Sequence, residues 1–187
     1  RALRFAAGHV EVPDLGMGPV DQLTFELWLN RQSDPTDFFA LFATHGWAAS
    51  GLHFNIAAGA LGEFAVNGNP TPWSHWSAGA IGQWNHWAAT YDLAEGQAQI
   101  KVYVNGSLAA TGAASTPILL DGGRIGRWGE QRAFDGYLDE VAIYSSTLAH
   151  EQVLRHYAAA RIPEPVDEVE LHYARPRNGV RPARAPA

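Results

Sequence analysis

Cysteine is absent from the 187 residues of this sequence. Its absence excludes a disulfide framework, a zinc site with cysteine ligands and a thiol nucleophile. Lysine is almost absent as well, because Lys101 is the only one, and arginine supplies nearly all of the positive charge. Acidic residues outnumber basic residues by 19 to 13, and the formal net charge of −6 argues against nucleic acid as a general partner.

Long apolar runs are also missing. No stretch approaches the ~20 continuous apolar residues of a membrane-spanning helix, so no membrane insertion is predicted. Hydrophobic residues make up 47% and charged residues 17%, which fits one well-buried globular domain. The first residue is Arg1 and no signal peptide is visible, as in a processed secreted protein or a piece of a longer one. We expect a protein that is secreted or lies at the surface of a cell or particle.

What is present is a series of strand patterns. Apolar and polar residues alternate over residues 23–30, 52–56 and 100–104, with the period of two that a strand with one buried face requires. Residues 38–42 are continuously apolar, as in a buried central strand. Asn105-Gly106 separates two such runs and favours a tight hairpin. Many short strands with turns between them predict a sandwich or barrel.

The end of the chain differs from the rest. Apolar positions on one side of a helical wheel predict a single helix near residues 148–158, which Pro163 and Pro165 would end. We therefore predict a domain at residues 1–160 and an extended tail, rich in proline and arginine, at 161–187. Within the tail, residues 168–173 alternate like a half-buried strand. That strand could fold back on its own sandwich or pair with a neighbouring subunit in a homo-oligomer.

The order of several short motifs resembles the laminin-G-like members of the concanavalin A-like lectin/glucanase family. The motifs are Ala2-Leu3-Arg4-Phe5, His9-Val10-Glu11-Val12-Pro13, Phe25-Glu26-Leu27-Trp28-Leu29, Gln83-Trp84-Asn85-His86-Trp87, Val102-Tyr103-Val104-Asn105-Gly106, Gly123-Arg124-Ile125-Gly126 and Phe134-Asp135-Gly136-Tyr137-Leu138-Asp139-Glu140. The resemblance covers about residues 2–157. It implies an all-β, two-sheet antiparallel jelly-roll sandwich with one short C-terminal helix. It does not imply one function, because this scaffold serves lectins, adhesion modules, enzyme appendages and matrix or virion components.

The resemblance also implies a calcium site that would use Asp139 and Glu140. Ala6-Ala7-Gly8 stands where family members often have a further acidic ligand. The alternative is that both residues end a strand and pair with arginines or backbone amides. Calcium is the only cofactor that the sequence suggests.

Catalysis is not predicted. The Glu-x-Asp-x-Glu pattern that supplies the paired carboxylates of jelly-roll glucanases is absent. No Gly-x-Ser-x-Gly elbow and no His-Glu-x-x-His pair occur either, and His86 is interpreted as structural.

Tryptophans outside the strand motifs indicate a ligand site. Residues 69–77 form a proline-rich segment that we expect to be a loop, Trp47 lies in another predicted loop, and one further tryptophan follows Gly126-Arg127. Exposed aromatic rings beside polar side chains suit sugar rings, although the same residues could cover the core or fill an interface. The predicted ligand-binding residues are Trp73, His75, Trp76 and Trp128. Trp28, Trp84 and Trp87 are assigned to the core.

Two functions remain open at this point. The first is a non-catalytic extracellular module that recognises a glycan or a protein partner. The second is a structural or assembly subunit of a matrix, filament or virion surface, which would use residues 161–187 for subunit contacts.

Overall fold

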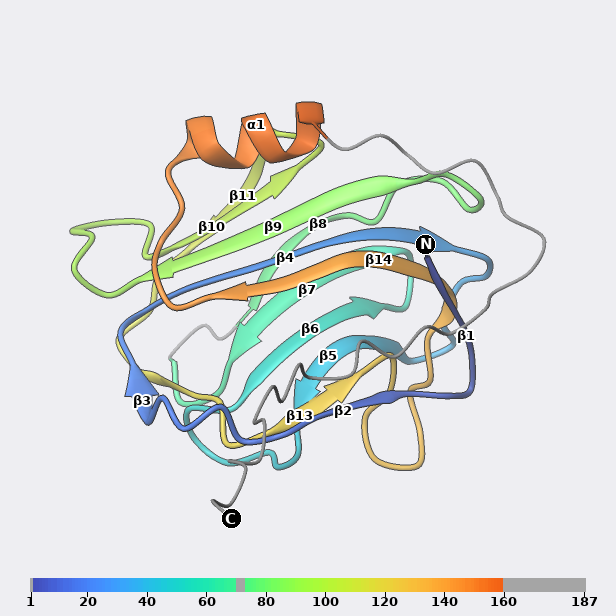
Figure 1. The fold of residues 1–187 in the computed structure, drawn as a ribbon, viewed down its shortest axis with the longest axis horizontal. Helices are drawn as coiled ribbons and strands as arrows, with labels where there is room; N and C mark the ends of the chain where they lie inside the picture. Colours follow the sequence, from blue (N-terminus) through green and yellow to red (C-terminus); the bar gives the residue numbers. More distant parts are fainter. Residues whose placement is uncertain (1, 70–72, 160–187) are drawn as a thin grey trace, which may run out of the picture.

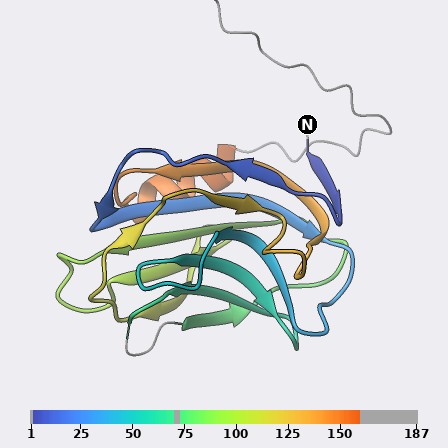
Figure 2. The ribbon, with the colours of Figure 1, turned by 90° about the horizontal axis from the view of Figure 1, so that it is seen from below.

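The computed structural model describes residues 2–69 and 73–159, which form a two-layered sandwich (Figure 1). Two six-stranded antiparallel sheets face each other, and Figure 2 shows them as stacked layers. The first sheet has the order β1 (Leu3–Ala6), β14 (Asp135–Tyr144), β4 (Gln22–Arg31), β9 (Asn85–Asp92), β10 (Ile100–Val104), β11 (Ser107–Gly112). The second has the order β2 (Val10–Val12), β13 (Gly123–Ile125), β5 (Phe38–Thr44), β6 (Leu52–Ala57), β7 (Leu61–Val66), β8 (Trp73–Ser77). The predicted fold class is confirmed.

Two further elements complete the domain. A two-stranded sheet pairs β3 (Pro19–Val20) with β12 (Ile118–Leu119), and the helix α1 (His150–Ala159) follows β14. In the described part of the chain, no helix is long and apolar enough to span a membrane. The predicted tail, residues 161–187, and the domain boundary at residue 160 lie outside the described residues.

Apolar side chains from alternate strand positions fill the space between the sheets. Phe25 on β4, Phe54 on β6 and Trp87 on β9 are completely buried. The ring centroid of Phe54 lies 5.5 Å from that of Phe25 and 5.7 Å from that of Trp87, so the two layers interlock. Burying one phenylalanine side chain stabilises the fold by about 1.5–3 kcal/mol. The apolar residues at every second strand position therefore form one continuous core.

The predicted hairpin and central strand are both confirmed. Asn105 and Gly106 join β10 to β11 with φ angles of +51° and +77°, the left-handed conformations of a tight hairpin turn. Strand β5 contains the continuously apolar residues 38–42 and lies between β13 and β6, inside the second sheet.

Helix α1 covers the outer face of the first sheet (Figure 1). Below it, the buried carboxylate of Glu26 accepts hydrogen bonds from His86 Nε2 at 2.6 Å and from His156 Nδ1 at 2.9 Å. Burial alone would raise the pKa of Glu26, but the hydrogen bonds and charge interactions with His86 and His156 together lower it. His86 thus joins the sheet to the helix through Glu26, which agrees with a structural role.

One of the tryptophans assigned to the core lies elsewhere. Trp84 precedes β9, is only half buried, and its ring centroid is 6.4 Å from that of the exposed Tyr137 on β14. The strand pattern does not reach Trp84, because β9 begins at Asn85. The assignment is therefore correct for Trp28 and Trp87, which are buried, and wrong for Trp84.

Candidate ligand-binding pocket

Strand β8 changes the interpretation of Trp76. The sequence predicts a loop over residues 69–77, but residues 73–77 are extended and pair with β7. Trp76 faces the core with 6% of its surface exposed, and its ring centroid lies 4.9 Å from that of Trp87. A Cβ atom on Gly62, directly opposite on β7, would overlap the Trp76 ring. The expectation that Trp76 binds a ligand is wrong, because pairing with β7 turns its side chain into the sandwich.

His75, one residue earlier, has the opposite orientation and lies on the outer face. Its Nε2 atom is 3.3 Å from Oε2 of Glu63, a carboxylate that is 4% exposed and also accepts a hydrogen bond from Asn55 Nδ2. Trp73 begins β8 and pairs with Ala65. A ligand-binding role for Trp73 and His75 stays a prediction.

Trp128 lies in a loop after β13 and contacts a different tryptophan. Its ring is edge-on to that of Trp47, with centroids 6.2 Å apart, and the Arg132 guanidinium lies 4.9 Å from the Trp128 ring centroid. Trp47 is 51% exposed, whereas Trp128 is half buried. The structure therefore brings Trp128 together with Trp47 rather than with Trp76.

A single row of side chains across the second sheet positions this aromatic pair. Glu11 on β2 pairs with Arg124 on β13, Arg124 with Ala43 on β5, and Ala43 with His53 on β6. Directly paired residues share one face of a sheet, and this row is on the face opposite Phe42 and Phe54. Since alanine has a small side chain, its position leaves a hollow between the charged end of the row and the aromatic end.

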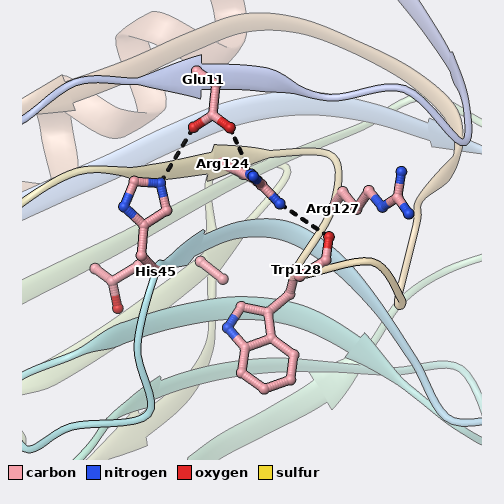
Figure 3. A pocket seen from close by; sticks show the side chains of 8 residues that line it. Glu11, His45, Arg124, Arg127 and Trp128 are labelled. Atoms are coloured by element: carbon pink, nitrogen blue, oxygen red, sulfur yellow. Dashed lines mark hydrogen bonds and ion pairs between the residues drawn. The ribbon is translucent and has the colours of Figure 1, made fainter.

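That hollow is a pocket of about 460 Å³. Strands β2, β13 and β5 and the loops that follow β5 and β13 provide its walls, with the labelled side chains shown in Figure 3. The lining residues are Glu11, Ala43, Thr44, His45, Arg124, Arg127, Trp128 and Gly129. Charged, aromatic and backbone groups thus converge on one concave site.

The charged end of the pocket is tightly organised. Arg124 Nε donates to Glu11 Oε1 at 2.7 Å, and His45 Nε2 lies 3.2 Å from Glu11 Oε2 (Figure 3). Arg124 also donates from Nη1 to the Gly129 carbonyl oxygen at 3.0 Å. The hydrogen bond from Arg124, followed by that from His45, lowers the pKa of Glu11 to about 2. Glu11 is consequently ionised at any physiological pH.

Trp47, which lies edge-on to the pocket residue Trp128, packs on a buried histidine. The ring centroid of Trp47 lies 4.4 Å from that of His53, which is 1% exposed. Asn67 Nδ2 donates to the Ala48 carbonyl oxygen at 3.1 Å and lies 3.3 Å from His53 Nε2, which must therefore accept. Burial, with a smaller effect from Arg132, lowers the pKa of His53 to about 4. His53 is neutral at pH 7, and Asn67 ties it to the loop that carries Trp47.

Glycine makes the loop of Trp128 possible. Gly126 follows β13 with φ of +84°, and any Cβ atom there would overlap the Phe5 ring. Its amide donates to the Leu41 carbonyl oxygen at 2.9 Å, and its carbonyl oxygen accepts from the Phe134 amide at 2.8 Å. Arg127 Nη1 then donates to the Ala7 carbonyl oxygen at 3.2 Å. The Gly-Arg-Ile-Gly motif therefore provides Arg124 and positions the loop that carries Arg127, Trp128 and Gly129 of the pocket wall.

Asp139 and Glu140 lie on the other sheet, at an irregularity in the pairing of β14 with β4. Glu140 has a φ of +50°, and its amide donates to Asp139 Oδ1 at 2.9 Å. Within residues 2–69 and 73–159, no group of three or more histidine or acidic side chains is placed to hold a metal ion. Within the described residues, Asp139 and Glu140 therefore do not form a metal-ligating group with a third histidine or acidic side chain, and calcium binding by them stays a prediction.

Residues 6–154 match the concanavalin A-like lectin/glucanase superfamily, described as Laminin_G_3, and the chain belongs to this family. The resemblance inferred from the ordered motifs is thereby confirmed. A search of curated proteins finds no match.

Solved structures share the fold at low sequence identity. A candidate carbohydrate-binding protein from Bacteroides ovatus is 23% identical with a TM-score of 0.66, over 82% of this chain but only 46% of the other. Domain 4 of a Geobacillus stearothermophilus arabinanase, in complex with arabinotriose, is 20% identical with a TM-score of 0.54, over 83% and 80%. The carbohydrate-binding module of a Ruminococcus gnavus sialidase, bound to α2,3-sialyllactose, is 15% identical with a TM-score of 0.59, over 84% and 98%. These similarities establish the fold.

Proposed function

We propose that this domain is a non-catalytic glycan-binding module whose ligand lies in the pocket above Ala43. The observation that carries the proposal is the exposed Trp47 ring, edge-on to Trp128, which lines the same pocket as the ordered Glu11–Arg124 pair. A sugar ring presents C–H groups that pack on an aromatic face, and its hydroxyls can donate to a carboxylate and accept from a guanidinium. The glycans in the solved relatives support this choice of ligand.

The state of the pocket carboxylate supports a non-catalytic role. A glycosidase needs one carboxylic acid that is protonated near neutral pH, and therefore has a raised pKa, with a second carboxylate nearby. The pKa of Glu11 is instead held at about 2 by Arg124 and His45, so Glu11 accepts hydrogen bonds and does not deliver a proton. Asp135 also has a lowered pKa, because Ser33 and Arg4 donate to it.

A glycan array tests the proposal with two matched variants. Trp47→Ala removes the exposed ring that lies edge-on to the pocket residue Trp128, and Trp84→Ala removes a half-buried ring that lies near Tyr137 of the first sheet. We expect binding of the parent protein, loss of binding in Trp47→Ala and unchanged binding in Trp84→Ala. If no glycan binds the parent, or if Trp84→Ala rather than Trp47→Ala loses binding, the proposed site is wrong. A location outside the cell or at a surface belongs to the same proposal, because glycans are displayed there.

Assembly through the tail is a second proposal, and it rests on the sequence alone. The alternation at residues 168–173 would suit strand addition to a neighbouring subunit, and the arginines that follow would suit the acidic surface of another copy. Sedimentation should show a lower oligomeric state after truncation at Arg161. A monomeric full-length chain, or equal assembly without the tail, would rule it out.

A further inference from the structure

The arginines beside the pocket are concentrated but not free. Three of the 13 basic residues fall within residues 124–132, which by itself suggests a site for an anion. Each, however, already forms an ion pair, and Glu130 also lies 4.0 Å from Arg124. The pairs are Arg124–Glu11 at 2.7 Å, Arg127–Glu130 at 2.8 Å and Arg132–Asp37 at 3.3 Å. The charges around the pocket therefore cancel in pairs.

Part of the hydrogen-bonding capacity of these arginines is also used within the protein. Arg124 donates from Nε to Glu11 and from Nη1 to Gly129, and Arg127 donates from Nη1 to Ala7 and from Nη2 to Glu130. A carboxylate or sulfate binds arginine best through two parallel N–H donors. On Arg124, one of the donors on the Nε side already binds Glu11, so an anion that approached this side would compete with Glu11.

Glu11 itself disfavours an anion. Its side chain is 52% exposed, is ionised near neutral pH and lines the pocket wall. A second negative charge would be repelled there, whereas a hydroxyl could donate to it, because a carboxylate has about four lone-pair sites. Arg124, His45 and His9 occupy three of them. One acceptor site thus remains for a ligand hydroxyl.

We propose that the pocket selects uncharged glycans and discriminates against glycans that carry a carboxylate or sulfate. This inference rests on the proposed glycan-binding function and names its ligand class. A neutral sugar keeps all three ion pairs intact, donates a hydroxyl to Glu11 and packs its ring on Trp47. An acidic sugar would compete with Glu11 for Arg124 or place its own charge beside that of Glu11.

The test is an array of neutral and acidic glycans in matched pairs, such as lactose with α2,3-sialyllactose, together with arabinotriose. We expect the neutral member of each bound pair to bind more tightly, with an affinity that changes little between low and high salt. Stronger binding of the acidic members, lost in Trp47→Ala, would overturn the inference while leaving the proposed function intact. Absence of binding to every glycan would instead overturn the proposed function.

A charge-removing variant provides the second readout. Glu11→Gln leaves Arg124 without its counter-charge, so the ratio of acidic to neutral affinity should rise by about ten-fold. The matched control is Glu95→Gln, which removes an exposed partner of Lys101 away from the pocket and should leave the ratio unchanged. An unchanged ratio in Glu11→Gln, in a protein with the thermal stability of the parent, would contradict the inference.

Discussion

The indole of Trp47 packs on the imidazole of His53, with ring centroids 4.4 Å apart. Trp47 is half exposed and His53 is buried, so an aromatic surface that faces solvent rests on a fixed support. A preorganised ring loses less conformational freedom when a ligand binds than a mobile one does. Contact with the buried His53 therefore holds the Trp47 ring in a fixed position next to Trp128.

The first prediction concerns pH. The unfolded chain protonates His53 near its ordinary pKa of 6.5, whereas the folded chain does so only near pH 4. As pH falls from 6.5 towards 4, the unfolded state binds the proton first, so the free energy of unfolding decreases with a slope of at most about 1.4 kcal/mol per pH unit. Urea denaturation at pH 7.5 and pH 5 should show a loss of about 1–2 kcal/mol from this residue.

His53→Gln isolates that contribution. The variant will be less stable at both pH values, but its loss between pH 7.5 and pH 5 should be smaller than that of the parent. Equal losses in the two proteins would show that His53 is not held neutral in the fold.

The second prediction separates core tryptophan from pocket tryptophan. Trp76→Ala should lower the free energy of unfolding by about 3–5 kcal/mol, because it leaves a cavity against Trp87 and Phe54. Gly62→Ala, which forces a methyl group into the Trp76 ring, should lower it by about 1–3 kcal/mol. Trp47→Ala should change it by about 1 kcal/mol or less, since half of that ring is exposed. Chemical denaturation measures all three, and comparable losses for Trp47 and Trp76 would show that both are core residues.

The third prediction concerns the geometry of Arg124. Its guanidinium donates to Glu11 and to Gly129 from separate nitrogens, which the single ammonium of lysine cannot reproduce. Arg124→Lys should therefore weaken binding of the best neutral oligosaccharide about ten-fold, as measured by calorimetry. Arg155→Lys, on the exposed side of α1, is the control and should bind like the parent. Full affinity in Arg124→Lys would mean that only the charge matters.

The fourth prediction concerns metal removal. Glu11 accepts hydrogen bonds from Arg124 and His45 within the pocket, and the described residues form no group of three or more metal-ligating side chains. Dialysis against EDTA should leave glycan affinity and thermal stability unchanged. A fall in affinity that calcium restores would return Asp139 and Glu140 to consideration.

The fold was largely predictable from the sequence, because its signals are local. The alternation over residues 100–104 and the Asn105-Gly106 turn lie within one hairpin, and local pattern determines both. The same reasoning failed for Trp76, since residues 69–77 have the composition of a loop and only pairing with β7 makes the last five a strand. Composition alone could not reveal that partner.

The pocket was harder to predict because its residues meet through long-range pairing. Glu11 and Arg124 are 113 positions apart in the sequence and become neighbours only when β2 pairs with β13. Each belongs to a motif that marks the family, yet no local signal joins them. The sequence identifies Trp47 as a loop tryptophan. Its contact with His53 depends on how β5 pairs with β6, which the sequence does not reveal.

The most direct test of the central claim is the response of the tryptophan indole N–H signals in a two-dimensional NMR spectrum during titration with the best neutral oligosaccharide from the array. The chain has seven tryptophans, and single substitutions assign their signals. The account predicts that Trp47 and Trp128 shift progressively and saturate, while Trp84 on the other sheet and Trp87 in the core stay in place. Shifts confined to Trp84, or saturation of binding with Trp47 and Trp128 unmoved, would contradict it.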